Sequence, residues 1–391
     1  VLETHIHADF ASGAKELAER TGAALHLSAY DEGELYETSF GHQELRDGDS
    51  IQLGGVRIQA LHTPGHTPEH LSFLVYDHNR APQVPMLMLS GDFLFVGSLG
   101  RPDLLGEEAK RGLANQLYDS VTQKLAGLPD GLEIHPAHGA GSMCGAGMSG
   151  RPMSTLGFER IANPYLEPSL TREAFVARIL GNVPPFPPYY RRMKVLNAVG
   201  PAFLSELPGG QALSPAEVDA LLKNGAVLMD LADQAAFGAA HVPGAIGIGS
   251  RDSVSIWASW LLPYDRPLIL SAPSAADLDL GRRALVRVGL DNIVGHLAGG
   301  TAAWQAAGRP VADLPQWRPA DLKQRLAQGN GLLILPERLD ELPRDAQILV
   351  ACRSGYRSTA AASVLQRAGF AQVINLAGGL EALADAGLDL S

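Results

Sequence analysis

Residues with the spacing of metal ligands open the chain. His5, His7 and Asp9 form a His-x-His-x-Asp run, and Phe10 stands where a further histidine would complete a motif for two adjacent metal ions. Imidazole and carboxylate groups are ligands that Zn²⁺ and Fe²⁺ accept in proteins. A phenylalanine side chain cannot bind a metal, so Phe10 raises the question of whether this is a two-metal centre or a site of another kind.

Two later segments supply ligands of the same kind. His66 lies in TPGHT, where Pro-Gly forces a tight loop after an alternating strand, and Asp92 lies in SGD after the apolar run MLMLS. Loops at strand ends are free to aim their side chains at one point. We expect these groups to converge with His5 and His7, and His138 in HPAHG is a further candidate. The histidines without such a context are expected to be structural: His26, His42, His62, His70 and His78.

A second centre is predicted around Cys352 in VACRSGYRS. The cysteine follows an apolar strand and precedes a helical run, with Arg353 and Arg357 close by. A loop between a strand and a helix start directs backbone N–H groups and the positive end of the helix dipole inward. These groups lower the pKa of a thiol and bind anions, so the pattern predicts a nucleophilic cysteine.

The elements that must position these residues follow from periodicity and composition. The first third of the chain reads as α/β, with helices over 11–21 and 104–126, a hairpin over 50–67, and strands in LSFLVYDH and MLMLS. The stretch NVPPFPPYYRRMKVLN, residues 182–197, is rich in proline and aromatic residues and is predicted to be a stiff connector rather than a core element.

An internal repeat follows the connector. GHLAGGTAAWQAAGRPV (295–311) is similar to INLAGGLEALADAGLDL (374–390), a period of roughly 80 residues. A helix-like stretch and an apolar strand precede each segment, so two copies of one small α/β unit with parallel sheets are predicted.

The composition limits the classes of function. The 391 residues include 31 Lys and Arg against 42 Asp and Glu, a net charge of −11, which argues against nucleic-acid binding because phosphate contacts need clustered cations. No apolar run reaches the roughly 18 residues that span a bilayer. The two cysteines cannot form a disulfide framework, so a cytoplasmic location is expected. The chain starts at Val1, close to its first motif, and we expect a missing N-terminal segment that would carry any targeting peptide.

The order of the histidine and aspartate motifs resembles the metallo-β-lactamase superfamily over residues 1 to about 170, without the opening strands of that family. Within the superfamily the pattern is similar to the persulfide dioxygenases, which hold one non-haem Fe(II). The resemblance implies one Fe(II) per chain, with His5, His66 and Asp92 as its ligands. His7, Asp9 and His138 then lie around the metal or bind it.

GSLGRPDL (97–104) resembles a GRxD segment of the same family. The resemblance implies that Arg101 grips the anionic part of the substrate and that Asp103 orients Arg101; a solvent-facing salt bridge is the alternative. Cys144, in HGAGSMCG, is either a thiol that handles persulfide sulfur near the iron or a small buried residue.

CRSGYR resembles the active-site loop of the rhodanese sulfurtransferases, which implies that Cys352 is catalytic and is assisted by Arg353 and Arg357. MDLADQAAFGAAHVPGAIGI (229–248) resembles the entry segment of the same fold. The first copy has LSAPSAADL (270–278) where the cysteine loop belongs, so it is expected to be inactive. The second copy has a shortened front half, LLILPERLDELPRDA (332–346).

The implied fold is α/β and multidomain. A metallo-β-lactamase αββα sandwich is expected over 1–175, a connector over 176–205, an inactive rhodanese-like domain over 206–312 and a rhodanese domain over 313–391. This order resembles bacterial fusions in which O2 and iron oxidise a low-molecular-weight thiol persulfide to sulfite. The resemblance implies that Cys352 would then pass persulfide sulfur to sulfite and form thiosulfate.

Two alternatives stay open. One is a glyoxalase II-like zinc thioesterase joined to a sulfurtransferase, which needs two metals or an activated zinc-bound water. The other is a sulfur carrier or partner-docking protein that uses the inactive copy as a binding surface. The sequence leaves open which thiol carries the persulfide and whether the chain forms a homo-oligomer.

Overall fold

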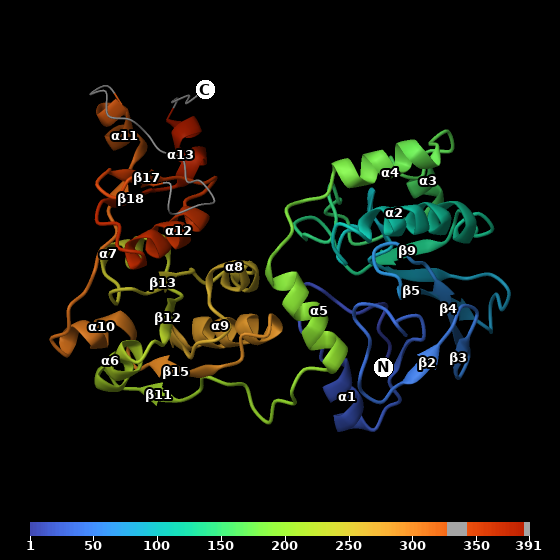
Figure 1. The fold of residues 1–391 in the computed structure, drawn as a ribbon, viewed down its shortest axis with the longest axis horizontal. Helices are drawn as coiled ribbons and strands as arrows, with labels where there is room; N and C mark the ends of the chain where they lie inside the picture. Colours follow the sequence, from blue (N-terminus) through green and yellow to red (C-terminus); the bar gives the residue numbers. More distant parts are fainter. Residues whose placement is uncertain (327–341, 387–391) are drawn as a thin grey trace. The chain divides into compact units, whose positions relative to one another are not determined.

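The structure is a computed structural model that describes residues 1–326 and 342–386. The chain divides into two compact units, Val1–Phe203 and Leu204–Ser391 (Figure 1). Among the described residues, no helix is both long enough and apolar enough to cross a membrane. Most of the front half predicted for the second repeat, residues 332–341, lies outside the described residues, as do residues 387–390 of the repeat segment. The predicted domain boundaries stay predictions.

The first unit is built on a mixed six-stranded sheet with the order β10-β9-β6-β5-β4-β3. Its strands are β3 (Ser50–Leu53), β4 (Val56–His62), β5 (Leu71–Asp77), β6 (Leu87–Gly91), β9 (Glu133–Pro136) and β10 (Ser154–Thr155). Neighbouring strands are antiparallel except β6 and β9, which are parallel. Two further strand pairs are β1 (His26–Ser28) with β2 (Gln43–Leu45), and β7 (Leu94–Phe95) with β8 (Ser98–Leu99). The predicted hairpin is confirmed, with Leu53 opposite Val56.

Both faces of this sheet are covered. The helices of the unit are α1 (Ala14–Thr21), α2 (Lys110–Asp119), the π-helix η1 (Ser120–Lys124), α3 (Leu156–Ala162), α4 (Arg172–Gly181) and α5 (Tyr189–Val199). On β5, Leu74 and Tyr76 pack in one core with residues of α2, η1 and α4, whereas Leu71 and Phe73 pack with Leu45 of β2 in another. Because successive strand residues point to opposite faces, a strand buried on both faces is a nearly continuous apolar run, as LSFLVY is apart from Ser72.

The structure corrects the expectation of a stiff connector over 182–197. Residues 189–199 form helix α5 inside the first unit, and its side chains Tyr190, Met193, Lys194 and Asn197 are buried. Pro188, directly before the helix, already has helical backbone angles (φ −56°, ψ −33°) and is compatible with a helix start. The segment that follows is a core element of the unit that holds the histidine motifs.

The second unit contains both repeats, each with a parallel sheet, as predicted. The first repeat has the strand order β11-β15-β14-β12-β13 and the second has β16-β18-β17. The strands are β11 (Ala212–Leu213), β12 (Val227–Asp230), β13 (Ile246–Gly247), β14 (Leu268–Ser271), β15 (Ile293–Leu297), β16 (Gln316–Trp317), β17 (Ile348–Val350) and β18 (Val373–Leu376). The helices are α6 (Pro215–Lys223), α7 (Gln234–Ala239), α8 (Val254–Leu261), α9 (Ala275–Arg287), α10 (Gly300–Ala306), α11 (Pro319–Leu326), α12 (Tyr356–Arg367) and α13 (Gly379–Asp385).

The two repeats share one hydrophobic core. Leu228 and Ile269 of the first sheet belong to the same buried cluster as Ile348 and Val350 of the second. Burial of apolar surface is the main favourable contribution to folding. Each repeat therefore contributes side chains to a hydrophobic core that both repeats share.

Candidate metal centre and cysteine site

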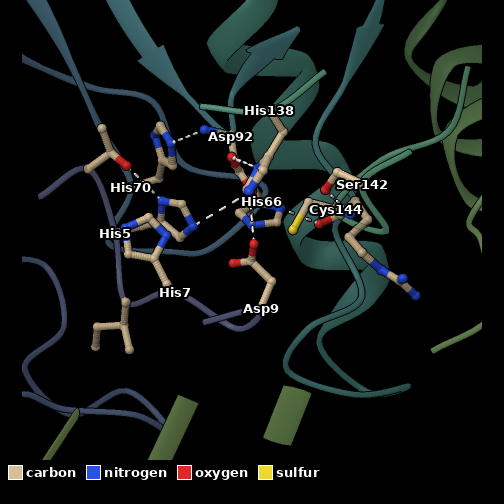
Figure 2. A network of polar contacts seen from close by, with 12 residues as sticks. His5, His7, Asp9, His66, His70, Asp92, His138, Ser142 and Cys144 are labelled. Atoms are coloured by element: carbon tan, nitrogen blue, oxygen red, sulfur yellow. Dashed lines mark hydrogen bonds and ion pairs between the residues drawn. The ribbon is translucent and has the colours of Figure 1, made fainter. Parts of the chain in front are cut away.

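Three side chains from distant segments converge in the first unit. His66 Nε2 lies 3.3 Å from Asp92 Oδ2, and His5 Nε2 lies 3.8 Å from the same oxygen. All three side chains are buried, and Figure 2 shows them around one point. The structure thus brings together His5, His66 and Asp92.

These facing atoms fit a metal ion. Among the described residues, His5 Nε2, His66 Nε2 and Asp92 Oδ2 are buried without a hydrogen-bond partner. A buried polar atom without a partner costs about 1–3 kcal/mol, and three of them together call for a ligand. Two imidazoles and one carboxylate are a donor set that suits Fe(II) or Zn²⁺.

The second ring nitrogen of each histidine fixes its orientation. His66 Nδ1 lies 2.9 Å from the Arg101 carbonyl oxygen, to which it can only donate, so Nε2 carries the free lone pair. His5 Nδ1 lies 2.8 Å from Thr4 Oγ1. Burial lowers the pKa of both imidazoles, which keeps them neutral. Such outer contacts hold metal-binding histidines in place.

His138 links the two acidic residues of the site. Its Nδ1 lies 2.8 Å from Asp92 Oδ1 and its Nε2 lies 2.8 Å from Asp9 Oδ2. Although burial lowers it, the pKa of His138 is raised to about 11 by the charges of Asp92 and Asp9. His7 lies beside the cluster, with its ring centroid 4.3 Å from that of His5 and 4.3 Å from that of Phe10.

His70 is part of the site, although the sequence suggested only a structural role. Its Nε2 accepts a hydrogen bond of 3.0 Å from the backbone N–H of Asp92, and its Nδ1 lies 2.9 Å from Thr63 Oγ1. The ring is fully buried, and its hydrogen bond fixes the backbone of Asp92, the residue that directly follows β6. The second histidine of TPGHTPEH, four residues after His66, was the available signal.

The loop that carries His66 is pressed against α2. Gly65 has a φ of +141°, and an added Cβ would come within 2.6 Å of Leu117 Cα. Ser120 Oγ at the end of α2 donates to the Pro64 carbonyl at 2.7 Å. The position of His66 therefore depends on glycine at position 65 and on the helix behind it.

The Arg101 guanidinium connects separate loop segments through hydrogen bonds, and its N–H groups are not free to bind an anion. Its guanidinium binds both carboxylate oxygens of Asp103, at 2.7 and 2.8 Å, and donates to the carbonyls of Met143, Pro184 and Pro185. A guanidinium has five N–H donors, and all five are used here. The side chain is 1% exposed. The substrate contact expected for Arg101 would break these bonds, and the solvent-facing salt bridge considered as its alternative does not match a buried side chain.

Cys144 is buried next to the metal-ligand cluster. Its Sγ lies 3.5 Å from Tyr190 Oη, on helix α5. The ligand atoms of Asp9, His138 and Cys144 all lie within 4.8 Å of one another (Figure 2). Burial and the charges of Asp9 and Asp92 raise the pKa of Cys144, so its thiol keeps its proton.

In the second unit, Cys352 lies in the loop between β17 and α12. Burial alone would raise its pKa, but hydrogen bonds from the Ser358 hydroxyl and from the N–H groups of Ser358, Ser354 and Gly355 lower it overall. Both Ser358 donors lie 3.4 Å from Sγ. Gly355 begins α12 with a φ of +85°, which a glycine adopts without strain.

The two arginines of this loop point to other groups. Arg353 is exposed and its Nε bonds Glu381 Oε1 at 2.6 Å. The Arg357 guanidinium lies 5.8 Å from the ring centre of Trp257, in the first repeat. Both remain near the loop that carries Cys352, where their charge favours an anionic substrate.

The first repeat also supports the cysteine loop. Tyr356 Oη donates to the Gly249 carbonyl at 2.9 Å, Gln234 Nε2 donates to the Ser354 carbonyl at 3.4 Å, and the Arg251 guanidinium stacks 4.7 Å above the Tyr356 ring. The loop that carries Cys352 is therefore held partly by residues of the first repeat.

At its own loop, the first repeat has a cavity of about 680 Å³ without a thiol or an arginine among its lining residues. The buried carboxyl of Asp230 lies in its wall, beside Ser271 and Ala272. Because no thiol lines this cavity, the first repeat offers no counterpart of Cys352 there, and its inactivity stays a prediction.

Comparison with known proteins gives the family. The model of the metallo-beta-lactamase superfamily matches residues 1–138, and that of the rhodanese-like domain matches residues 214–307 and 322–386. A solved structure, "Metallo-beta-lactamase from Staphylococcus aureus subsp. aureus COL", is 30% identical with a TM-score of 0.66. It covers 76% of this chain, and the match covers 83% of that chain. The chain belongs to the metallo-β-lactamase superfamily. Its remaining part carries rhodanese-like domains.

Some of the relatives carry functional names. The mitochondrial persulfide dioxygenase ETHE1 of Homo sapiens is 32% identical over 46% of this chain and 61% of its own length. A protein of Burkholderia pseudomallei named "Probable metallo-hydrolase" is 30% identical over 45% of this chain and 63% of its own length. The chain thus spans about three fifths of the length of each.

Proposed function

We propose that this chain is an enzyme of sulfur metabolism, an Fe(II)-dependent persulfide dioxygenase joined to a rhodanese-type sulfurtransferase. The observation that carries the first activity is the set of three buried, facing and unpartnered atoms of His5, His66 and Asp92. The likeness to ETHE1 and the rhodanese-like domains support the pairing of the two activities.

At the first site the residues bind, orient and hold protons. When bound there, Fe(II) would supply open coordination positions for O2 and for the sulfur substrate. Neutral His5 and His66 offer lone pairs, and His138, protonated between Asp9 and Asp92, keeps the Asp92 carboxylate turned toward them. Overall, one persulfide, one O2 and one water give one thiol, one sulfite and two protons. The terminal persulfide sulfur is oxidised and O2 is reduced.

At the second site Cys352 is the nucleophile. Its thiolate attacks the terminal sulfur of a second persulfide, the S–S bond of that persulfide breaks, and the thiolate of the carrier leaves. Sulfite then attacks the terminal sulfur on Cys352, which forms thiosulfate and returns the Cys352 thiolate. The Ser358 hydroxyl and the N–H groups of the loop stabilise the thiolate at both stages.

Product analysis of the Cys352→Ser variant tests the pairing. Supplied with thiol persulfide and O2, this variant is expected to release sulfite and almost no thiosulfate, whereas the unaltered protein releases thiosulfate. The His66→Ala variant is the control, because it should consume no O2 yet still form thiosulfate from persulfide and added sulfite. Thiosulfate formed by Cys352→Ser at the unaltered rate would contradict the role of Cys352.

One observation favours the hydrolase alternative. Asp9, His138 and Cys144 form a second group of ligand types within 4.8 Å, as a two-metal site would need. Against it, both ring nitrogens of His138 are taken by carboxylates. These contacts, together with Phe10, support one metal per chain, and metal stoichiometry separates the two functions.

A further inference from the structure

We propose that Lys194 and Asn197 of helix α5 are positioning residues for the metal centre, setting the backbone of the loop that carries His5, His7 and Asp9. The inference rests on the proposed function in one respect, that the residues around His5 bind a metal. Neither residue lies in a segment matched by a family model, since these end at residue 138 and resume at 214.

The loop has no regular structure to hold it. Residues 3–13 belong to no helix or strand, so the buried N–H and C=O groups of this segment have no ladder of their own. Buried backbone groups of native proteins are almost always paired. The partners of this loop must therefore come from elsewhere in the unit.

Asn197 supplies three of these partners. Its Nδ2 donates to the carbonyls of His7 at 2.8 Å and Phe10 at 2.7 Å, and its Oδ1 accepts from the N–H of Ser12 at 2.8 Å. The side chain is 5% exposed. One amide thus fixes the backbone on both sides of Asp9, with both of its donor hydrogens and its acceptor used on the loop.

Lys194 closes a second set of contacts one turn earlier on the helix. Its Nζ donates to the Ile6 carbonyl at 2.8 Å and lies 3.5 Å from Glu69 Oε1, which accepts from the Ile6 N–H at 3.0 Å. Both backbone groups of Ile6, the residue between His5 and His7, are held in this way. Because Glu69 lies three residues after His66, the pair also connects the two loops that carry the histidine ligands.

The buried pair of Lys194 and Glu69 joins three segments, and burying charged groups costs free energy. Lys194 is 1% exposed and Glu69 is 3% exposed, and desolvation of such groups is repaid only when the remaining bonds are satisfied. Here each charged group bonds the backbone next to a ligand. The geometry points to a positioning role: these contacts hold the loop that carries His5, His7 and Asp9 in one place.

The test measures metal binding rather than turnover. Co²⁺ affinity, from competition with a chelator, and the visible spectrum of bound Co²⁺ are compared for the full chain and four variants. Asn197→Ala removes all three contacts, and Asn197→Asp keeps the size and the acceptor but loses both donors. Each is expected to weaken Co²⁺ binding by roughly 10- to 100-fold, the range for residues that orient ligands, and to change the spectrum.

Two controls lie on the same helix. Val195→Ala changes an exposed side chain and should alter nothing. Met193→Ala removes a fully buried side chain and should lower thermal stability while leaving Co²⁺ affinity and spectrum unchanged, which separates positioning from packing. Unchanged Co²⁺ affinity and spectrum in both Asn197 variants would overturn the inference. Absence of Co²⁺ binding by the unaltered chain would overturn the metal centre itself, and the inference with it.

Discussion

At the scale of single residues, Ser358 contacts the sulfur of Cys352, the proposed nucleophile, through its hydroxyl and its backbone N–H. Its hydroxyl has one hydrogen and two acceptors within reach, Cys352 Sγ at 3.4 Å and the Gly355 carbonyl at 3.0 Å. A charged acceptor attracts a donor more strongly than a neutral one. Ionisation of Cys352 should therefore turn this hydroxyl toward sulfur and stabilise the thiolate.

Removing that hydroxyl should make Cys352 less reactive. The pKa of Cys352 is lowered in the folded protein, so the thiolate is present above this pKa and is lost as the pH falls through it. In Ser358→Ala the pKa rises, and the alkylation rate at neutral pH should fall by roughly tenfold, as expected for one charge-assisted hydrogen bond. The pH dependence of alkylation by iodoacetamide measures the shift.

Ser354→Ala is the matched control, because Ser354 contributes through its backbone N–H, which the substitution keeps. Its pH profile should coincide with that of the unaltered chain. An unchanged profile in Ser358→Ala would mean that the backbone groups alone set the pKa of Cys352.

At the scale of elements, α2 sets the position of the loop that carries His66. In Gly65→Ala the new Cβ would overlap Leu117 in a backbone conformation that alanine rarely adopts. The loop must move away from the helix, so metal affinity should fall at least about tenfold and thermal stability should fall as well. Titration with Co²⁺ and thermal unfolding check both effects.

Gly112→Ala on the same helix is the control, since nothing lies within 4 Å of a Cβ at that position. Alanine is a better helix former than glycine by about 1 kcal/mol, so this variant should bind Co²⁺ normally and melt at the same temperature or higher. Normal Co²⁺ affinity in Gly65→Ala would show that the loop does not depend on its contact with α2.

Elements were predictable where a local pattern encodes them. The hairpin of β3 and β4 follows from two alternating runs around Gly54-Gly55, and the cysteine loop from an apolar strand before CRSGYR. Helix α5 was missed because proline dominates the composition just before it. Its inward positions, such as Tyr190, Lys194 and Asn197, have helical spacing but are polar or amphipathic, so no apolar stripe marks the helix.

The site was predictable at the level of ligand motifs but not of the contacts that position them. His66 and Asp92 have recognisable flanks, Pro-Gly and Ser-Gly. The bonds of Asn197 and His70 go to backbone groups of distant segments, and a backbone group leaves no trace in the sequence. For Arg101 the motif is visible in the sequence, but its hydrogen-bond partners are not. The five acceptors of its N–H groups come from three separate segments.

At the scale of the molecule, each unit holds one of the two candidate sites. The candidate metal ligands His5, His66 and Asp92 lie within Val1–Phe203, and Cys352 with its supporting residues lies within Leu204–Ser391. Sulfite is small and soluble, so it can pass between protein molecules through solution. The two proposed activities should therefore complement each other when they are carried by different chains.

Mixing two variants that each lack one activity tests this. We expect His66→Ala to form no sulfite and Cys352→Ser almost no thiosulfate, whereas an equimolar mixture supplied with persulfide and O2 should form thiosulfate at a rate that rises with protein concentration. Each variant alone is the control. A mixture that accumulates sulfite without thiosulfate would show that sulfite must be handed over within one chain.

The most direct test of the dioxygenase is the metal content of anaerobically purified protein, measured together with O2 uptake on addition of a thiol persulfide. We expect one iron per chain and one O2 consumed for each sulfite or thiosulfate formed. Two zinc ions per chain, with no O2 uptake, would contradict the dioxygenase and favour the metal-dependent hydrolase.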